Sequence, residues 1–292
     1  EYGRMEQVAP MVRRIVARNP SRFTWHGTGT YVIGEGNVAV IDPGPDLAEH
    51  VDALLAALDG ENVTHLLVTH THRDHSPACA AVQAATGART YGFGRHGSGR
   101  IDRGVQVEEG ADHDFVPDVH LSHGDVVSGD GWSMECVHTP GHTSNHLCYQ
   151  LREQKALFCG DHVMGWSTTI ISPPDGDIVS YLASLELLLD RQDDLYWPTH
   201  GPCISDPKPL VKALIAHRLE RAEEIRACLA NGVHRIADMV PRMYPELPKA
   251  MHPAAARSVF STLIYLIERG EAICEGELDV AARFALDSTA GA

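Results

Sequence analysis

The chain has 292 residues, a net charge of −15 and 43% hydrophobic residues, which fits one large domain plus a small one with a sizeable core. No stretch approaches the roughly 20 consecutive apolar residues of a membrane span, and the N-terminus lacks the layout of a signal peptide. We therefore expect a cytoplasmic protein without a membrane partner. The seven cysteines form no C-x-x-C pair, which favours reduced thiols over a disulfide framework.

The first elements are expected to be strands. Apolar runs at 22–25, 30–33 and 38–41 predict three strands, and leucines and valines at helical spacing predict a helix over about 46–58. The third run leads directly into Asp42. We expect Asp42 to lie near a functional site, either as a hydrogen-bond partner of its residues or in a structural role.

A cluster of metal-binding residue types follows the next apolar run, 65–68. It consists of His70, His72, Asp74 and His75. Imidazole and carboxylate together suit zinc, iron or nickel better than calcium or magnesium. The alternative is a polar surface loop that happens to be rich in histidine. Ser76 and Pro77 predict an N-cap and the first residue of a helix over 78–85, so that a helix start would fix the cluster.

The segment 91–123 is rich in glycine with interleaved arginines. Such a long irregular stretch is either a mobile substrate loop or a surface connection. We favour the surface connection, although its arginines form the best basic cluster of the first domain.

Three later apolar runs end in turns that contain glycine or proline, and each turn carries a further ligand type. These residues are His142, Asp161 and His200. The pattern indicates buried strands that end at one rim of a sheet, where side chains from several strands meet. Five histidines and two aspartates exceed the four ligands of a closed tetrahedral site, so the count favours two metal ions over one.

A second, helical unit is expected over residues 205–292, after a first domain of residues 1–204. Its predicted elements are a long helix from Asp206-Pro207 to 231–232, a short helix over 235–240 ended by Pro241, a third helix from Pro253 to Gly270, and strand-like pieces around 271–274. Three helices and a small hairpin resemble a winged-helix domain.

The metal motifs resemble the signature of the metallo-β-lactamase fold hydrolases, a His-x-His-x-Asp-His run followed by separate His, Asp and His positions. The resemblance covers about residues 27–201 and implies an α+β fold, the αββα metallo-β-lactamase sandwich. With His75 and Asp161, the chain resembles the glyoxalase II, RNase Z and lactamase-like hydrolase side of this family. Many zinc β-lactamases have Cys in place of Asp161, and flavodiiron oxygen reductases have Glu in place of His72. The C-terminal unit is similar to that of the mitochondrial lactamase-like endoribonuclease.

The resemblance also implies a ligand set and a cofactor. The first metal ion would be held by His70, His72 and His142, the second by Asp74, His75 and His200, and Asp161 would bridge both. The implied cofactors are two Zn²⁺ ions, with iron or manganese as alternatives. Two such ions about 3.5–4 Å apart can share a hydroxide nucleophile and polarise an acyl or phosphoryl oxygen.

Two residues are candidates for a direct catalytic role. Asp74 is expected to orient the attacking water or accept its proton, with ligation alone as the alternative. His146 is expected to line the substrate side or donate to the developing oxyanion, with a structural role as an equal alternative. We expect His162 to be an outer hydrogen-bond partner of a ligand. Thr168 and Thr169 receive no role.

Three functions are weighed. The leading one is a binuclear zinc-dependent hydrolase of a small-molecule acyl substrate, which is an ester, thioester, lactone or lactam, acting through a metal-bridging hydroxide. The alternative is a metal-dependent endoribonuclease acting on single-stranded RNA. The third is a non-hydrolytic redox or binding protein, which the full ligand set disfavours.

The charge distribution bears on the choice between these functions. Residues 205–292 carry 11 Lys and Arg against 12 Asp and Glu, and the remainder carries 13 against 27. Nucleic-acid-binding proteins normally present a basic stripe to the phosphates. The acidic balance therefore disfavours nucleic acid as a partner. We expect the helical unit to be a lid or the dimerisation element of a homodimer.

Overall fold

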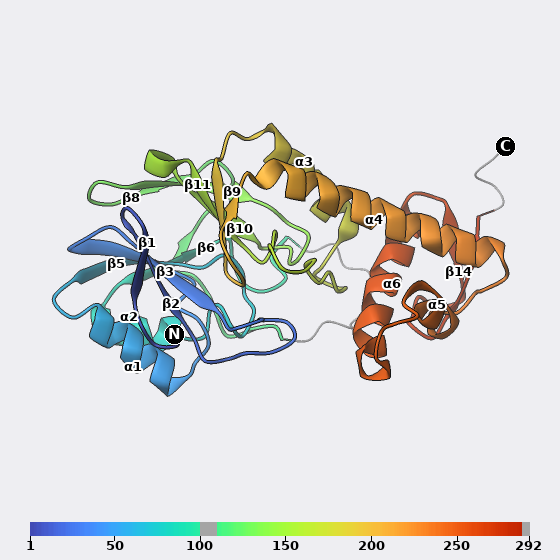
Figure 1. Cartoon of the computed structure of the whole chain (residues 1–292), viewed down its shortest axis with the longest axis horizontal. Helices are drawn as coiled ribbons and strands as arrows, with labels where there is room; N and C mark the ends of the chain where they lie inside the picture. Colours follow the sequence, from blue (N-terminus) through green and yellow to red (C-terminus); the bar gives the residue numbers. More distant parts are fainter. Residues whose placement is uncertain (100–109, 288–292) are drawn as a thin grey trace.

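Two stacked β-sheets form the centre of the larger part of the molecule (Figure 1). The computed structural model describes residues 1–99 and 110–287. Within them, the first sheet has seven strands in sequence order: β1 (Glu6–Ala9), β2 (Val12–Val16), β3 (Gly29–Ile33), β4 (Asn37–Ile41), β5 (Asn62–Leu67), β6 (Arg89–Gly92) and β7 (Val119–His120). Neighbours are antiparallel from β1 to β4 and parallel from β4 to β7.

The second sheet has six strands in the described residues, in the order β13-β12-β11-β10-β9-β8. They are β8 (Val126–Ser128), β9 (Ser133–His138), β10 (Leu147–Leu151), β11 (Ala156–Gly160), β12 (Leu195–Pro198) and β13 (Ile204–Ser205). β10 is antiparallel to both β9 and β11, and β11 is parallel to β12. The carboxyl ends of β9, β11 and β12 therefore reach the same edge of this sheet.

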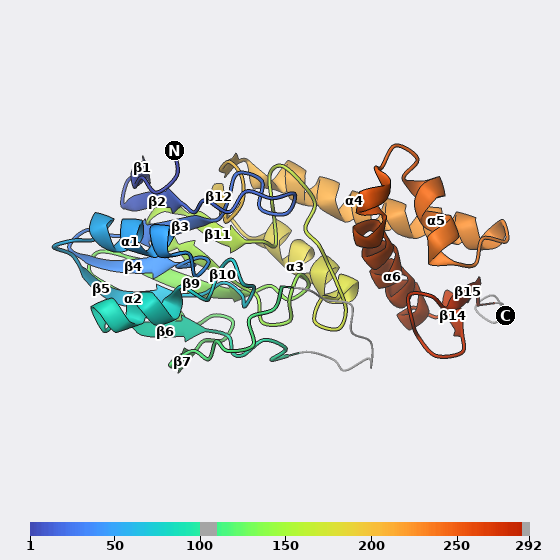
Figure 2. The ribbon, with the colours of Figure 1, turned by 90° about the horizontal axis from the view of Figure 1, so that it is seen from below.

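Alternation along the strands builds the layers. In β4, Val38 and Val40 pack under helices α1 (Ala48–Ala57) and α2 (Cys79–Thr86), while Ala39 and Ile41 face the second sheet. In β11, Leu157 faces outward toward α3 (Ile178–Asp190), and Phe158 faces the first sheet. Helices thus cover both outer faces (Figure 2), and the expected αββα sandwich is confirmed.

The C-terminal unit contains the expected three helices and hairpin: α4 (Pro207–Ala230), α5 (Ile236–Met243), α6 (His252–Glu268), and the paired strands β14 (Ala272–Glu275) and β15 (Arg283–Leu286). α4 runs from the sandwich along the unit to its far end (Figure 1). One hydrophobic cluster contains Leu185 of α3, Leu214 of α4 and Leu263 of α6, so the core continues from the sandwich into this unit. The division after residue 204 stays a prediction, because β13 straddles it and pairs with β12.

The segment predicted as a strand at 22–25 forms a turn instead. The hydroxyl oxygen of Ser21 accepts hydrogen bonds from the backbone N–H groups of Phe23 and Thr24, each at 3.0 Å. A serine hydroxyl that binds nearby backbone groups in this way competes with sheet pairing. The apolar run is therefore held as a loop beside the sheet.

Three helix ends differ from the prediction, either in the capping residue or in the last residue. α2 begins at Cys79 without a side-chain cap, and the hydroxyl of Ser76 donates to the Asp112 carboxylate instead. Asp206 precedes α4 but makes no side-chain cap, and Pro241 lies inside α5. Pro241 has no N–H to donate to the carbonyl four residues earlier, and α5 continues for only two residues beyond it.

Part of the glycine-rich segment 91–123 lies outside the described residues, and with it the arginines at 100 and 103 of the predicted basic cluster. The parts described belong to β6, β7 and their connections. None of the helices in residues 1–99 and 110–287 combines the length and apolar character needed to cross a membrane.

Candidate metal centre

The predicted ligands all follow the ends of strands. The run from His70 to His75 follows β5, His142 follows β9, Asp161 comes directly after β11, and His200 follows β12. The backbone N–H of Leu147 donates to the Thr69 carbonyl at 2.7 Å, which holds the end of β5 against the second sheet. The structure therefore brings together all seven residues that the sequence singled out.

Three histidine nitrogens converge on one point. Nδ1 of His72 lies 3.0 Å from Nε2 of His70 and 3.0 Å from Nε2 of His142. Tetrahedral zinc with Zn–N bonds of about 2.0–2.1 Å has neighbouring nitrogens at similar separations, roughly 3.3 Å. These residues, the three-histidine group, therefore have the chemistry and spacing of one metal site.

A second set of ligand atoms lies beside the first. Nε2 of His200 is 3.1 Å from Oδ2 of Asp74, and Nε2 of His75 is 3.5 Å from the same oxygen. All three ligand atoms lie within 4.8 Å of one another. We call Asp74, His75 and His200 the mixed group.

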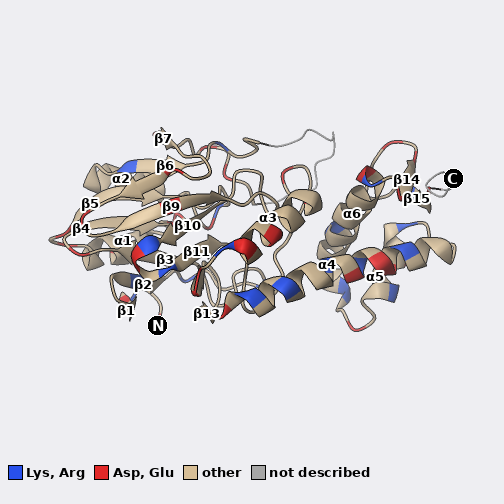
Figure 3. Ribbon diagram, turned by 90° about the horizontal axis from the view of Figure 1, so that it is seen from above, with Lys and Arg blue, Asp and Glu red and all other residues tan. Residues whose placement is uncertain are grey.

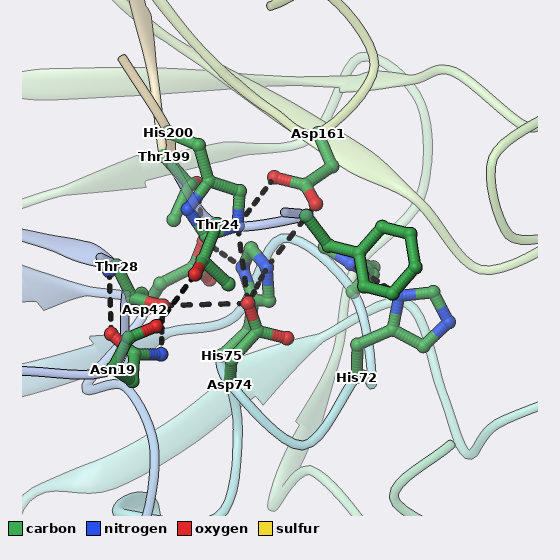
Figure 4. A network of polar contacts seen from close by, with 12 residues as sticks. Asn19, Thr24, Thr28, Asp42, His72, Asp74, His75, Asp161, Thr199 and His200 are labelled. Carbon is green, nitrogen blue, oxygen red and sulfur yellow. Dashed lines mark hydrogen bonds and ion pairs between the residues drawn. The ribbon is translucent and has the colours of Figure 1, made fainter. Parts of the chain in front are cut away.

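Asp161 lies between the two groups (Figure 4). Its Oδ2 is 3.8 Å from Nε2 of His142 in the three-histidine group and 3.6 Å from Nε2 of His75 in the mixed group. Its Oδ1 is 3.4 Å from Nε2 of His200. A carboxylate in this position can offer an oxygen to both sites.

The far sides of the ligand rings are hydrogen-bonded. Nδ1 of His142 donates to the Ile170 carbonyl at 2.5 Å, and Nδ1 of His200 donates to the Gly27 carbonyl at 3.2 Å. Because a carbonyl can only accept, these Nδ1 atoms carry a proton, and Nε2 is the ring atom left to ligate a metal ion. Outer hydrogen bonds of this kind are typical of metal-ligating histidines, so the residues present fit a metal centre.

Electrostatics distinguishes the two groups. Burial lowers the pKa of His142 to about 4, with a smaller contribution from His72, so its ring stays neutral and able to ligate. Burial also acts on His200, but the carboxylates of Asp161 and Asp74 outweigh it and raise the pKa of His200 to about 10. The carboxylates of the mixed group and Asp161 therefore stabilise positive charge, which a metal cation also supplies.

Two glycines give the ligand loops their shape. Gly160 has φ +52°, and an added Cβ would lie 2.5 Å from Nε2 of His146. Gly141 has φ +145°, and a Cβ there would lie 2.4 Å from the Cα of Tyr181. At both points a larger residue would collide with these neighbours, so glycine is required there. Each glycine directly precedes a proposed ligand.

His146 lies behind the ligands. It is fully buried, its Nδ1 is 2.9 Å from the Thr139 hydroxyl, and its Nε2 accepts from the Asp161 N–H at 3.3 Å. His146 is not among the described residues that line the cavity into which the ligands open. This position supports the structural alternative for His146, as a residue that holds the Asp161 backbone.

His162 is buried without a polar partner for either ring nitrogen in residues 1–99 and 110–287. Its ring lies against those of His146 and Tyr181, with centroids 5.6 and 4.7 Å away. Burial lowers the pKa of His162 to about 3, so the ring is neutral. It supports the site by packing, and not by the hydrogen bond to a ligand that the sequence suggested.

The ligands open into a cavity of about 300 Å³. His72, Asp74, His142, Asp161 and His200 form part of its wall. Apolar side chains on the wall are Phe23, Met164 and Ile170, and two arginines, Arg73 and Arg257, also line it. A small organic molecule could therefore reach both ligand groups.

Sequence reasoning missed several residues around this site. Arg257 of the C-terminal unit lines the cavity, and Thr169, which received no role, lies 3.0 Å from Nδ1 of His142 through its hydroxyl. Nothing in the sequence distinguishes an arginine that lines a cavity, such as Arg257, from one on the solvent-exposed face of a helix. The pair Thr168-Thr169 was a visible motif, but its partners are distant in sequence.

Comparison with known proteins agrees with the fold and the site described above. Residues 24–200 match the family described as the metallo-beta-lactamase superfamily, and residues 236–279 match the beta-lactamase associated winged helix domain. A Beta-lactamase-like protein 2 homolog from Drosophila melanogaster is 31% identical, over 89% of each chain. An atrochrysone carboxyl ACP thioesterase from Claviceps purpurea is 27% identical, over 84% of this chain and 76% of that one.

The fold of this chain is also found in solved structures. A crystal structure of a metallo-beta-lactamase family protein from Thermus thermophilus aligns with a TM-score of 0.76 at 21% identity, covering 96% of this chain and all of that one. The sandwich, the order of the ligand motifs and the family matches agree. This chain therefore belongs to the metallo-beta-lactamase superfamily, as a metal-dependent hydrolase with a C-terminal winged-helix domain.

Proposed function

We propose that this protein is a binuclear zinc-dependent hydrolase of a small acyl substrate. Of the four candidate classes, which are thioesters, esters, lactones and lactams, we favour a thioester. The observation that carries the proposal is the position of Asp161, between two complete ligand groups and on the wall of a cavity. The thioesterase from Claviceps purpurea supports the choice of a thioester, since it is related over most of this chain.

The proposed ligands follow from the two groups. The three-histidine group would hold the first ion, the mixed group would hold the second, and Asp161 would offer an oxygen to each. When bound there, the ions would lower the pKa of a water molecule and polarise the acyl oxygen of the substrate. Iron or manganese would satisfy the same donor atoms.

Asp74 is proposed to orient the attacking water in addition to ligating. Burial alone would raise the pKa of Asp74, but His75 and His200 outweigh it and hold that pKa well below its usual range, so the carboxylate stays ionised. Asp74 also lines the cavity, and an ionised carboxylate there can accept a hydrogen bond from water. Thr28 contributes a hydroxyl 3.4 Å from Oδ2, which leaves the other oxygen, Oδ1, for the cavity side.

The cavity wall favours a substrate with an apolar acyl part and an anionic group. Phe23, Met164 and Ile170 supply apolar surface, while Arg73 and Arg257 place two positive charges around the opening. The wall also carries Asp74 and Asp161, whose charges the proposed metal ions would neutralise, so the two arginines would remain to attract an anionic group. Arginine binds carboxylates and phosphates through several N–H donors.

The proposal is tested by a substrate panel. Zinc-loaded protein is assayed with a thioester, a lactone, a β-lactam and single-stranded RNA, beside Asp161→Ala as the matched inactive variant. We expect metal-dependent hydrolysis of an acyl substrate, the thioester first, that is lost in Asp161→Ala. Metal-dependent cleavage of RNA without turnover of any acyl substrate would replace this function with an endoribonuclease.

A further inference from the structure

Residues 169–171 form a short connection, which we call the strap, that touches the three-histidine group on one side. Nδ1 of His142 donates to the Ile170 carbonyl at 2.5 Å and lies 3.0 Å from the Thr169 hydroxyl. Thr169 and Ile171 are buried. The strap has no regular secondary structure, so its shape must be fixed by the groups that pack against it.

The other side of the strap is held by the C-terminal unit. Arg218 of α4 donates through Nη2 to the Thr169 carbonyl at 2.5 Å, and the Ser261 hydroxyl of α6 donates to the Ile171 carbonyl at 2.5 Å. The backbone carbonyls on both sides of Ile170 thus accept hydrogen bonds from two different helices of the C-terminal unit, which we call the winged-helix unit.

Arg218 is an unusual residue for a helix interface. It is only 5% exposed, and its guanidinium lies 5.4 Å from the centre of the Tyr181 ring. Burying a guanidinium is costly unless its donors are satisfied. An apolar side chain would fill the same space without that cost, so the charged residue is better explained by the carbonyl it holds than by packing alone.

The arrangement links the winged-helix unit to a ligand atom. A fixed Ile170 carbonyl fixes the direction of the His142 Nδ1–H bond, and the rigid ring then directs Nε2 toward Nδ1 of His72, 3.0 Å away. Outer hydrogen-bond partners orient ligand rings, and their loss commonly costs about 10–100-fold in metal affinity.

We propose that the winged-helix unit sets the metal affinity of the three-histidine group, with Arg218 and Ser261 as positioning residues that act through the strap. The inference rests on the proposed function, which assigns this group to a metal ion. The unit would then do more than cover the cavity, because it would complete the support of a ligand.

The test measures zinc affinity instead of turnover. The full chain carries His200→Ala, which leaves the three-histidine group as the site to be titrated, and zinc is titrated in competition with a chelator of known affinity. Arg218→Met and Ser261→Ala should each raise the Kd for zinc by about 10-fold, the lower end of the range for outer-partner changes. Thr169→Val, which removes the hydroxyl beside His142, should act in the same direction.

Matched controls come from the same helices. Thr262→Val removes a buried hydroxyl of α6 that donates within its own helix, to the Ser258 carbonyl. Arg221→Met removes an α4 arginine whose guanidinium lies over Tyr244 and pairs with Glu224. Both should leave the Kd unchanged, even if they lower the unfolding temperature of the metal-free protein as much as their partner variants do.

The outcomes are distinguishable. If the unaltered chain binds two zinc ions while Arg218→Met and Ser261→Ala bind zinc as tightly as their controls, the inference is overturned and the proposed function stands. If the unaltered chain binds no zinc, the proposed function itself fails. Should Arg218→Met not fold, the pair Ser261→Ala and Thr262→Val decides the question.

Discussion

The Asp42 carboxylate accepts a hydrogen bond from Nδ1 of His75 at 2.9 Å, deep beneath the mixed group. Asp42 also accepts from the backbone N–H and the hydroxyl of Thr69, each at 2.8 Å, and from the Thr199 hydroxyl at 3.1 Å. One side chain at the end of β4 therefore ties together the ends of β5 and β12 (Figure 4). The sequence placed Asp42 near the site without identifying these partners.

Asp42→Asn should weaken metal binding at the mixed group by about 10–100-fold, because an amide cannot hold the His75 ring as a carboxylate does. Stepwise zinc titration with a competing chelator measures the effect. Asp118→Asn is the control, since Asp118 also accepts backbone and hydroxyl hydrogen bonds from Thr90 but lies away from the ligands. Equal zinc affinity in the two variants would contradict this role for Asp42.

Asp161 and His162 should respond very differently to substitution. Asp161→Ala should abolish turnover and weaken the retention of metal without unfolding the chain, since it removes the carboxylate shared by both groups. His162→Phe keeps a ring in the same packed position and removes nitrogens that have no polar partner in the described part of the chain. We expect it to keep bound metal and most activity, as elemental analysis and steady-state kinetics would show. Near-normal turnover in Asp161→Ala would mean that the bridge is misassigned.

Arg257→Ala should impair the binding of anionic substrates. A hydrogen bond to a charged group contributes about 1.5–3 kcal/mol, so KM for an acyl substrate bearing a carboxylate should rise roughly 10-fold or more. The KM for a neutral analogue should not change. Arg269→Ala is the control and should leave both KM values unchanged, since Arg269 follows the end of α6 and pairs with Glu271. The same rise in KM for both substrates would point to a change in cavity shape instead of charge recognition.

RNA binding should be weak and insensitive to salt. Along α4 basic and acidic positions occur together (Figure 3), and the pairs Arg221–Glu224 and Arg226–Glu223 neutralise part of its charge. A protein that tracks phosphates loses affinity steeply as salt rises, because released counterions drive its binding. Filter binding or fluorescence anisotropy at two salt concentrations would measure this. Micromolar binding at physiological salt would contradict the expectation.

The sequence was most informative where chemistry is local. The ligands from His70 to His75 and the three later positions each follow an apolar run, and the strands expected there are present. The turn at Ser21 was missed because a hydroxyl binding its own neighbours leaves no periodic signal. The contact between Arg218 and Thr169 was missed because it joins residues 49 positions apart, and helical spacing alone does not reveal which face meets which loop.

The hydrophobic cluster that runs from the second sheet through α3 and α4 to Phe284 of β15 has a consequence for unfolding. A chain whose two parts had separate cores would melt in two steps, the smaller part first. Here Leu185, Leu214 and Phe260 share one core, so loss of the C-terminal helices would expose apolar surface on the sandwich. Heat or denaturant should therefore unfold the protein in a single cooperative transition, with the same midpoint by fluorescence and circular dichroism. The two parts, which match separate sequence families, would then behave as one thermodynamic unit.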